Sequence, residues 1–251
     1  MEHRHGVAEQ VESLGRGDVM RRRMFASLLA ATCVCALCST AVWSAPSATP
    51  RAVSQRGWST QVDPELVSDT EVAIDGVDGF WKKNWSDFFT GSYQSPQIHG
   101  SLGFYDVSKP SAPGCGGEPA EKYNAFYCPS GDYLAWSVDF MDVGFNWVGD
   151  SWVYLIVAHE WGHAIQERLK VELRSVDGEL QADCLAGAEL MGATNDGSIV
   201  WEQGDTEEIV SALQKLGDAT PWTNPSDHGD IAQRESAFGK GVQGGVEACL
   251  P

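Results

Sequence analysis

Positive charge is scarce in this sequence. Its 251 residues include 17 lysines and arginines against 35 aspartates and glutamates, which gives a formal net charge of −18 at pH 7. A surface this negative repels phosphate backbones and anionic membrane surfaces. The composition therefore predicts no nucleic-acid partner. It says little about the substrate, because an acidic surface also serves solubility alone.

Charged residues are absent from Met24–Trp43, an apolar run that follows Arg21–Arg23 and precedes small residues. A basic segment, an apolar run and a small-residue exit together predict an export signal over residues 1–44. The alternative is an uncleaved anchor, because about 20 uncharged residues just span a bilayer. Either way the rest of the chain faces outward. We therefore expect a secreted or extracytoplasmic protein that contacts a membrane only through residues 24–43.

Regular hydrophobic spacing is missing from residues 45–70, which are rich in Pro, Ser and Thr and predict an exposed linker. Residues 71–251 are expected to form one domain. Apolar spacing indicates helices, and aromatic or β-branched runs indicate strands. The predicted fold class is α+β, mainly helical with a small, mostly antiparallel sheet. The expected helices span 77–89, 152 onward (capped by Asp150 and Ser151), 178–192, 205–217 (with a capping box at 205–208) and the segment after 229, and the expected strands span 102–107 and 133–141.

Cysteine is sparse beyond the apolar run, where four remain: Cys115, Cys128, Cys184 and Cys249. An even number in an exported domain predicts two disulfides, and four cysteines allow three pairings. Joining Cys115 to Cys128 would staple a loop rich in Gly and Pro. Joining Cys184 to Cys249 would tie the C-terminal tail to the helix at 178–192. Buried free thiols are the alternative.

The chain has only six histidines, and two of them flank the motif His159-Glu160-Trp161-Gly162-His163. Histidines four residues apart lie on one face of a helix and can bind a single zinc ion. Glu160 is then placed to act as a base on a zinc-bound water. The uncharged residues around the motif suit a buried helix. The alternative is a chance match on a core helix.

A catalytic zinc needs a third protein ligand and an open position. The metzincin arrangement is excluded, because Gln166 and Leu169 stand where its Gly and His would be. A following helix offers Glu179 and Asp183, which lie four residues apart on one face. We assign Glu179 to the metal, since its longer side chain reaches further, and Asp183 to the outer nitrogen of a ligand imidazole. A solvated helix face is the alternative, but the neighbouring residues are apolar.

Three segments make a resemblance specific: His159-Glu-Trp-Gly-His-Ala-Ile-Gln166, Glu179-Leu-Gln-Ala-Asp-Cys-Leu-Ala-Gly187 and His228-Gly-Asp-Ile-Ala-Gln-Arg234. Together with the loop from Cys115 to Pro129, they resemble the bacterial neutral zinc metallopeptidase family over residues 75–249. The resemblance implies a zincin-like peptidase fold in which His159, His163 and Glu179 hold zinc and Glu160 is the base. The link from His163 to Glu179 is shorter than in the family pattern.

The segment from His228 to Arg234 is also similar to the His-Pro-x₄-Arg segment of the prenyl-protein endopeptidase class of gluzincins. That similarity implies that His228 donates a hydrogen bond to the oxyanion and that Arg234 pairs with Asp183 or a nearby carboxylate. A preorganised donor of this kind is worth about 3 kcal/mol. A simple helix cap or turn is the equally weighted alternative for His228.

These features predict an exported, zinc-dependent peptidase of the gluzincin type that acts on a peptide or protein substrate. An extended substrate would add to strand 133–141 if that strand lies at the edge of the sheet. Two other classes stay open. One is a catalytically weak or inactive zinc-binding scaffold of the same fold, and the other is a disulfide-stapled structural domain.

Overall fold

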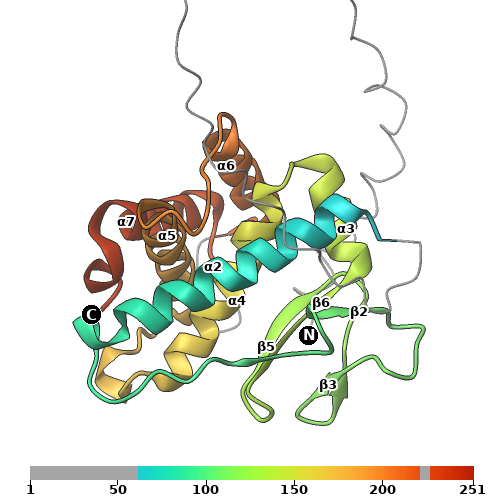
Figure 1. Cartoon of the computed structure of the whole chain (residues 1–251), viewed down its shortest axis with the longest axis horizontal. Helices are drawn as coiled ribbons and strands as arrows, with labels where there is room; N and C mark the ends of the chain where they lie inside the picture. The colour runs from blue at the N-terminus through green and yellow to red at the C-terminus, as the bar shows by residue number, and fades with distance from the viewer. Residues whose placement is uncertain (1–61, 221–226) are drawn as a thin grey trace, which may run out of the picture.

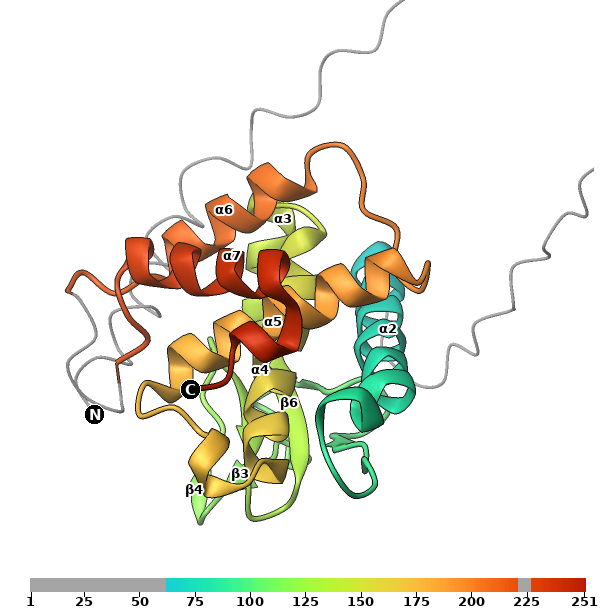
Figure 2. The same cartoon turned by 90° about the vertical axis from the view of Figure 1, so that its left-hand side faces the viewer.

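The computed structural model describes residues 62–220 and 227–251. Helices pack on both sides of a central helix, and a small sheet lies at one end (Figures 1 and 2). The α+β fold class, mainly helical with a small sheet, is confirmed. The helices are α2 (Pro64–Phe88), α3 (Val138–Trp147), α4 (Ser151–Arg168), the short 3₁₀ helix η1 (Val171–Leu173), α5 (Gly178–Asn195), α6 (Asp205–Leu216) and α7 (Ile231–Ala248).

The four-stranded sheet is mixed, where the sequence predicted mostly antiparallel pairing. β6 (Tyr133–Ser137) pairs antiparallel with β5 (Ala125–Cys128) but parallel with β1 (Gln97–Ile98) and β2 (Phe104–Tyr105). Because β5 runs along one edge of β6, β1 and β2 share the other edge as two pieces of an interrupted strand. The chain between β2 and β6 includes a separate antiparallel hairpin of β3 (Gly114–Cys115) and β4 (Glu118–Pro119). This connection is long enough to join two parallel strands.

The strand expected over 133–141 ends early. Ser137 closes β6 and caps α3, because its hydroxyl accepts from the N–H of Phe140 at 3.1 Å. Asp139 lies in the first turn of α3, where a negative charge is favourable. Val138, Phe140 and Met141, which were included in the longer strand, therefore belong to a helix that was not predicted from the sequence.

The first described helix also begins before its predicted start. Asp63 caps α2 by accepting from the N–H of Glu65, and Pro64 occupies the first helical turn, where its missing N–H costs nothing. The linker prediction is therefore wrong for residues 64–70. Residues 45–61 and the expected export signal lie outside the described residues. Among the described residues, no helix is long and apolar enough to cross a membrane.

α4 is the central helix of the domain. Thirteen of its eighteen residues are buried, and it contacts α2, α3, α5 and α6 as well as the sheet. Its start is not capped as expected, since Asp150 makes no side-chain cap bond. The carboxylate of Glu208 accepts from the Ser151 N–H instead, at 3.3 Å. The capping box expected at 205–208 is absent, because the Glu208 side chain binds Ser151 instead of the start of its own helix. Gly204 is the N-cap of α6.

α5 and α7 approach each other closely, as Figure 2 shows. A Cβ atom on Gly187 would overlap the backbone oxygen of Phe238, and one on Gly241 would overlap that of Cys184. The two glycines therefore let the helix backbones touch. A complete capping box between Asp230 and Gln233 fixes the start of α7. These contacts set the position of Arg234 relative to α5.

The structure contains both disulfides that the sequence predicted. Cys115 joins Cys128 across 13 residues, and Cys184 joins Cys249 across 65 residues. The first links the β3–β4 hairpin to β5, and the second links α5 to the C-terminal end of α7. Disulfides persist in oxidising compartments, so they suggest an extracytoplasmic location.

Gly187→Ala is expected to destabilise the domain by about 1–3 kcal/mol, because the added methyl must push two helix backbones apart. Denaturant unfolding measures the change. Gly79→Ala is the matched control, since a Cβ there meets no atom within 4 Å and alanine favours the helix. Equal stability of the Gly187 variant and the parent would contradict the close packing of α5 and α7.

Candidate metal centre

α4 and α5 bring the three predicted metal ligands together. One ligand atom each from His159, His163 and Glu179 lies within 4.8 Å of the other two. The Glu179 Oε2 is 3.2 Å from the His159 Nε2 and 3.4 Å from the His163 Nε2. Ligands about 2.05 Å from a tetrahedral zinc are about 3.3 Å apart. The donor types and these two spacings fit zinc, and the set of three protein ligands leaves a fourth position for water or substrate.

His159 is oriented by a buried ion pair. Its Nδ1 lies 2.8 Å from Asp183 Oδ1, and both Asp183 oxygens accept from Arg234 at 2.8 Å. Arg234 also donates to the Leu216 carbonyl at 3.0 Å. Burial alone would raise the pKa of Asp183, but Arg234 and then His159 lower it to about 2. The carboxylate therefore stays ionised and holds a proton on the Nδ1 of His159, which turns the Nε2 toward the other two ligands.

The ligand set is electrostatically coupled. Burial opposes charge on His159, yet Asp183 and then Glu179 raise its pKa to about 10. Burial likewise opposes charge on Glu179, yet the two imidazoles hold its pKa well below the usual range. In the metal-free site, protons on the imidazoles therefore balance the carboxylate.

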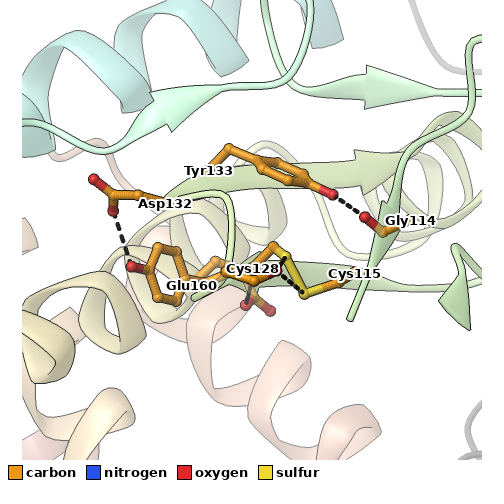
Figure 3. The surroundings of a disulfide bond; sticks show 8 residues. Gly114, Cys115, Cys128, Asp132, Tyr133 and Glu160 are labelled. Atoms are coloured by element: carbon orange, nitrogen blue, oxygen red, sulfur yellow. Dashed lines mark hydrogen bonds between the residues drawn. A yellow bond between two sulfur atoms is a disulfide. The ribbon is translucent and has the colours of Figure 1, made fainter. Parts of the chain in front are cut away.

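Glu160 faces the same region from α4 and is only 8% exposed. Its Oε2 accepts the backbone N–H of Tyr127 in β5 at 2.9 Å. Figure 3 shows Glu160 close to the Cys115–Cys128 disulfide, at the strand that carries Cys128. The β5 backbone therefore fixes this carboxylate beside the three ligands.

His228 is not the cap of α7, because Asp230 has that place. Its Nε2 lies 3.9 Å from Glu179 Oε2, and its backbone N–H donates to Asp218 at 2.8 Å. Burial lowers the pKa of His228, while Glu179 partly opposes this shift. A neutral imidazole beside the ligand set still carries one N–H that can be donated.

A cleft of about 500 Å³ opens over these residues. β5 forms one wall with Ala125, Phe126 and Tyr127, and α4 forms the floor. A second cavity of about 570 Å³, between α5 and α7, is lined by none of the three candidate metal ligands. The cleft over α4 is therefore the one that serves the site.

Two contacts at the site were missed from the sequence. Gln166 Oε1 lies 2.9 Å from the Nδ1 of His163, and Tyr127 holds Glu160 through its backbone. Gln166 follows His163 by three residues on one helix, so helical spacing would have indicated it. The Tyr127 contact has no sequence signal, because any residue type supplies a backbone N–H.

The fold is consistent with a mixed α+β, zincin-like domain in which His-Glu-x-x-His lies on one helix and a glutamate on the next. The family described as "Putative neutral zinc metallopeptidase" matches residues 168–250, which confirms the resemblance over that part of the chain. The match includes Glu179, Asp183, His228 and Arg234. It begins after His163 and is shorter than the predicted range of 75–249.

Two bacterial relatives extend beyond that match. The chain is 27% identical over 232 residues to the protein YpfJ of Escherichia coli K12, covering 80% of this chain and 77% of the relative. It is 32% identical over 163 residues to Rv2575 of Mycobacterium tuberculosis H37Rv, covering 53% of this chain and 55% of the relative. Both relatives are described as uncharacterized. No solved structure matches the chain.

Arg234→Met is expected to destabilise the domain by about 3–5 kcal/mol, because it leaves the fully buried Asp183 carboxylate without its countercharge. Lys83→Met is the matched control, since it removes an exposed partner of Asp196 and is expected to cost at most about 1 kcal/mol. Denaturant unfolding of the two variants measures both values. Similar small losses in the two variants would contradict the structural importance of the buried pair.

Proposed function

We propose that this chain is an exported, zinc-dependent peptidase that hydrolyses peptide bonds. One observation carries the proposal. His159, His163 and Glu179 lie at the spacing of a tetrahedral zinc site, and the carboxylate of Glu160 is fixed beside them at the floor of a cleft. The family match supports zinc as the metal and peptide hydrolysis as the reaction.

Zinc, when bound, supplies a Lewis acid that lowers the pKa of a water molecule and polarises the scissile carbonyl. Glu160 is the general base that takes a proton from the attacking water and passes it to the departing amine. The Tyr127 N–H already occupies its Oε2, so Oε1 is the oxygen assigned to the proton. This fixed geometry places the base without a rearrangement of its side chain.

His228 is the proposed donor to the negative oxygen of the tetrahedral intermediate. Its lowered pKa keeps the imidazole neutral near pH 7, and a neutral imidazole donates one N–H. The 3.9 Å between its Nε2 and Glu179 puts the ring at the ligand set without making it a ligand. Arg234 acts through Asp183 and does not face the substrate in this proposal.

The substrate is proposed to bind as an extended chain along β5. Strand 133–141 was expected to pair with a substrate only if it lay at the edge of the sheet, and β6 instead has partners on both sides. β5 has β6 on one side and lines the cleft, so its other edge can pair with a peptide backbone, except at the Tyr127 N–H, which already donates to Glu160. Such pairing reads backbone rather than side chains, which is suited to protein substrates of varied sequence.

Export rests on the predicted signal over residues 1–44 and is supported by the two disulfides. An enzyme with this site outside the cytoplasm would meet peptides and proteins in an oxidising compartment. Cleavage or retention of the signal decides between a secreted protein and one anchored by residues 24–43.

Glu160→Gln is expected to abolish cleavage while zinc stays bound, because the amide cannot accept the proton and no metal ligand is changed. A proteome-derived peptide library with mass spectrometry measures cleavage, and elemental analysis measures about one zinc per chain. The parent protein is the positive control. Cleavage by the variant at the parental rate would refute the assigned base. Stoichiometric zinc with no cleavage by the parent would favour the scaffold alternative.

Zinc binding is expected to release protons at pH 7, since the pKa of His159 is raised to about 10 in the metal-free site and zinc requires an unprotonated nitrogen. Affinity should fall as the pH is lowered, by about tenfold per pH unit for each proton released. Calorimetric titration in buffers of different ionisation enthalpy counts the protons. A binding heat that does not depend on the buffer would contradict the prediction.

A further inference from the structure

A chain of side-chain amides connects His163 to the C-terminal tail. Gln166, on α4, lies 2.9 Å from the Nδ1 of His163 through its Oε1. Its Nε2 donates to the Gly178 carbonyl at 2.6 Å and lies 3.2 Å from Gln181 Oε1. Gln181, on α5, donates in turn to the Cys249 carbonyl at 3.0 Å. The four groups form a continuous hydrogen-bonded path from the metal centre to the end of the chain.

The direction of the path is fixed at its far end. Gln181 Nε2 faces the carbonyls of Leu173 and Cys249, at 2.8 and 3.0 Å, and a carbonyl can only accept. Its Oε1 faces the N–H of Ser175 at 3.0 Å, and a backbone N–H can only donate. The backbone therefore allows a single orientation of the Gln181 amide, in which the Oε1 is turned toward Gln166.

The orientation of Gln181 fixes the amide of Gln166 and, through it, the tautomer of His163. Gln166 must direct its NH₂ group to Gly178 and Gln181, because both offer oxygens. Its own Oε1 then faces His163 and can only accept, so the Nδ1 of His163 carries the proton. Once the Nε2 proton is lost, the lone pair of His163 is on Nε2, which lies 3.4 Å from Glu179 Oε2. This is the tautomer that a metal at the three ligands requires.

We propose that Gln166 is a positioning residue for the metal ligand His163, and that Gln181 is the backbone-anchored support that orients it. The inference rests on the proposed zinc site and adds to it how the second histidine is held. His159 is oriented by a carboxylate that carries its own arginine, whereas His163 is oriented by a neutral amide. The neutral acceptor adds no further charge to a region that already contains Glu160, Glu179 and Asp183.

The path also accounts for the short link between the two ligand-bearing helices. Gln181 is 4% exposed and bonds Leu173 of η1, Ser175 and the tail residue Cys249. One side chain thus secures the turn from Lys170 to Asp177 against both α5 and the tail. The turn can be short because it is held from within the domain.

Gln166→Met tests the proposal through metal affinity rather than activity. Loss of such an outer partner typically weakens metal binding about 10–100-fold, and we expect a loss in this range. Gln166→Asn keeps an amide but is one methylene too short to bridge His163 and Gln181, so the same loss is expected. Gln166→Glu keeps an acceptor oxygen for His163 but sets its second oxygen against the Gly178 carbonyl and Gln181 Oε1. It is therefore expected to bind zinc more tightly than the Met variant but less tightly than the parent, and to lower the unfolding temperature of the metal-free protein. Gln214→Met, at an exposed position on α6, is the control and should bind zinc as the parent does.

Zinc affinity is measured for the purified protein by competition with a chromophoric chelator, and thermal unfolding of the metal-free protein is recorded for each variant. A purely structural role would lower the unfolding temperature of the metal-free Gln166 variants and leave zinc affinity unchanged, and that result would overturn the proposal. Equal weakening in the Glu and Met variants would overturn it as well. A parent protein that binds no zinc would refute the proposed function itself, whereas a zinc-binding parent with an unaffected Met variant would refute the positioning role alone.

Discussion

The buried pair of Asp183 and Arg234 is the interaction on which the metal centre and the packing of the last two long helices both depend. Burying two charges is costly, and it is tolerated here because every strong bond of the pair is made: the guanidinium binds both carboxylate oxygens and the Leu216 carbonyl. The carboxylate has a second task at His159. Glycines at the contact of α5 and α7 bring the arginine close enough for the pair to form. Helix packing and ligand orientation are thus parts of one arrangement.

The two histidines of the motif receive different support from the fold. A charged acceptor on α5 holds His159, and a neutral amide on α4 lies at His163. An ionised acceptor makes an imidazole more basic and a stronger ligand, while an amide mainly fixes its orientation. His159 is therefore both oriented and made more basic by its partner, whereas His163 is mainly oriented by its partner. Glu160 is held by a backbone N–H of β5, so the two histidines and Glu160 all have partners outside the candidate metal position.

Features that follow from spacing along one helix were predictable from the sequence. His159 with His163, and Glu179 with Asp183, share a face by helical geometry, and the even number of cysteines indicated the two disulfides. Features that depend on which segments meet in space were not. Three such features arise from tertiary neighbours: the parallel pairing of β1 and β2 with β6, the switch from strand to helix at Ser137, and the Tyr127 contact with Glu160. Gln166 stood at a predictable position, but the partners that fix its amide come from the turn and the tail.

The Cys184–Cys249 disulfide joins residues 65 positions apart and closes a covalent ring that contains α6 and all of α7. The ring begins one residue after Asp183 and includes Arg234. A single backbone cut anywhere between the two cysteines opens the ring but leaves both fragments in one molecule. The Asp183 carboxylate and the Arg234 guanidinium therefore stay in one molecule after such a cut, as long as the disulfide is intact. This closure therefore keeps the buried pair within one molecule after a cut in the chain between α5 and α7.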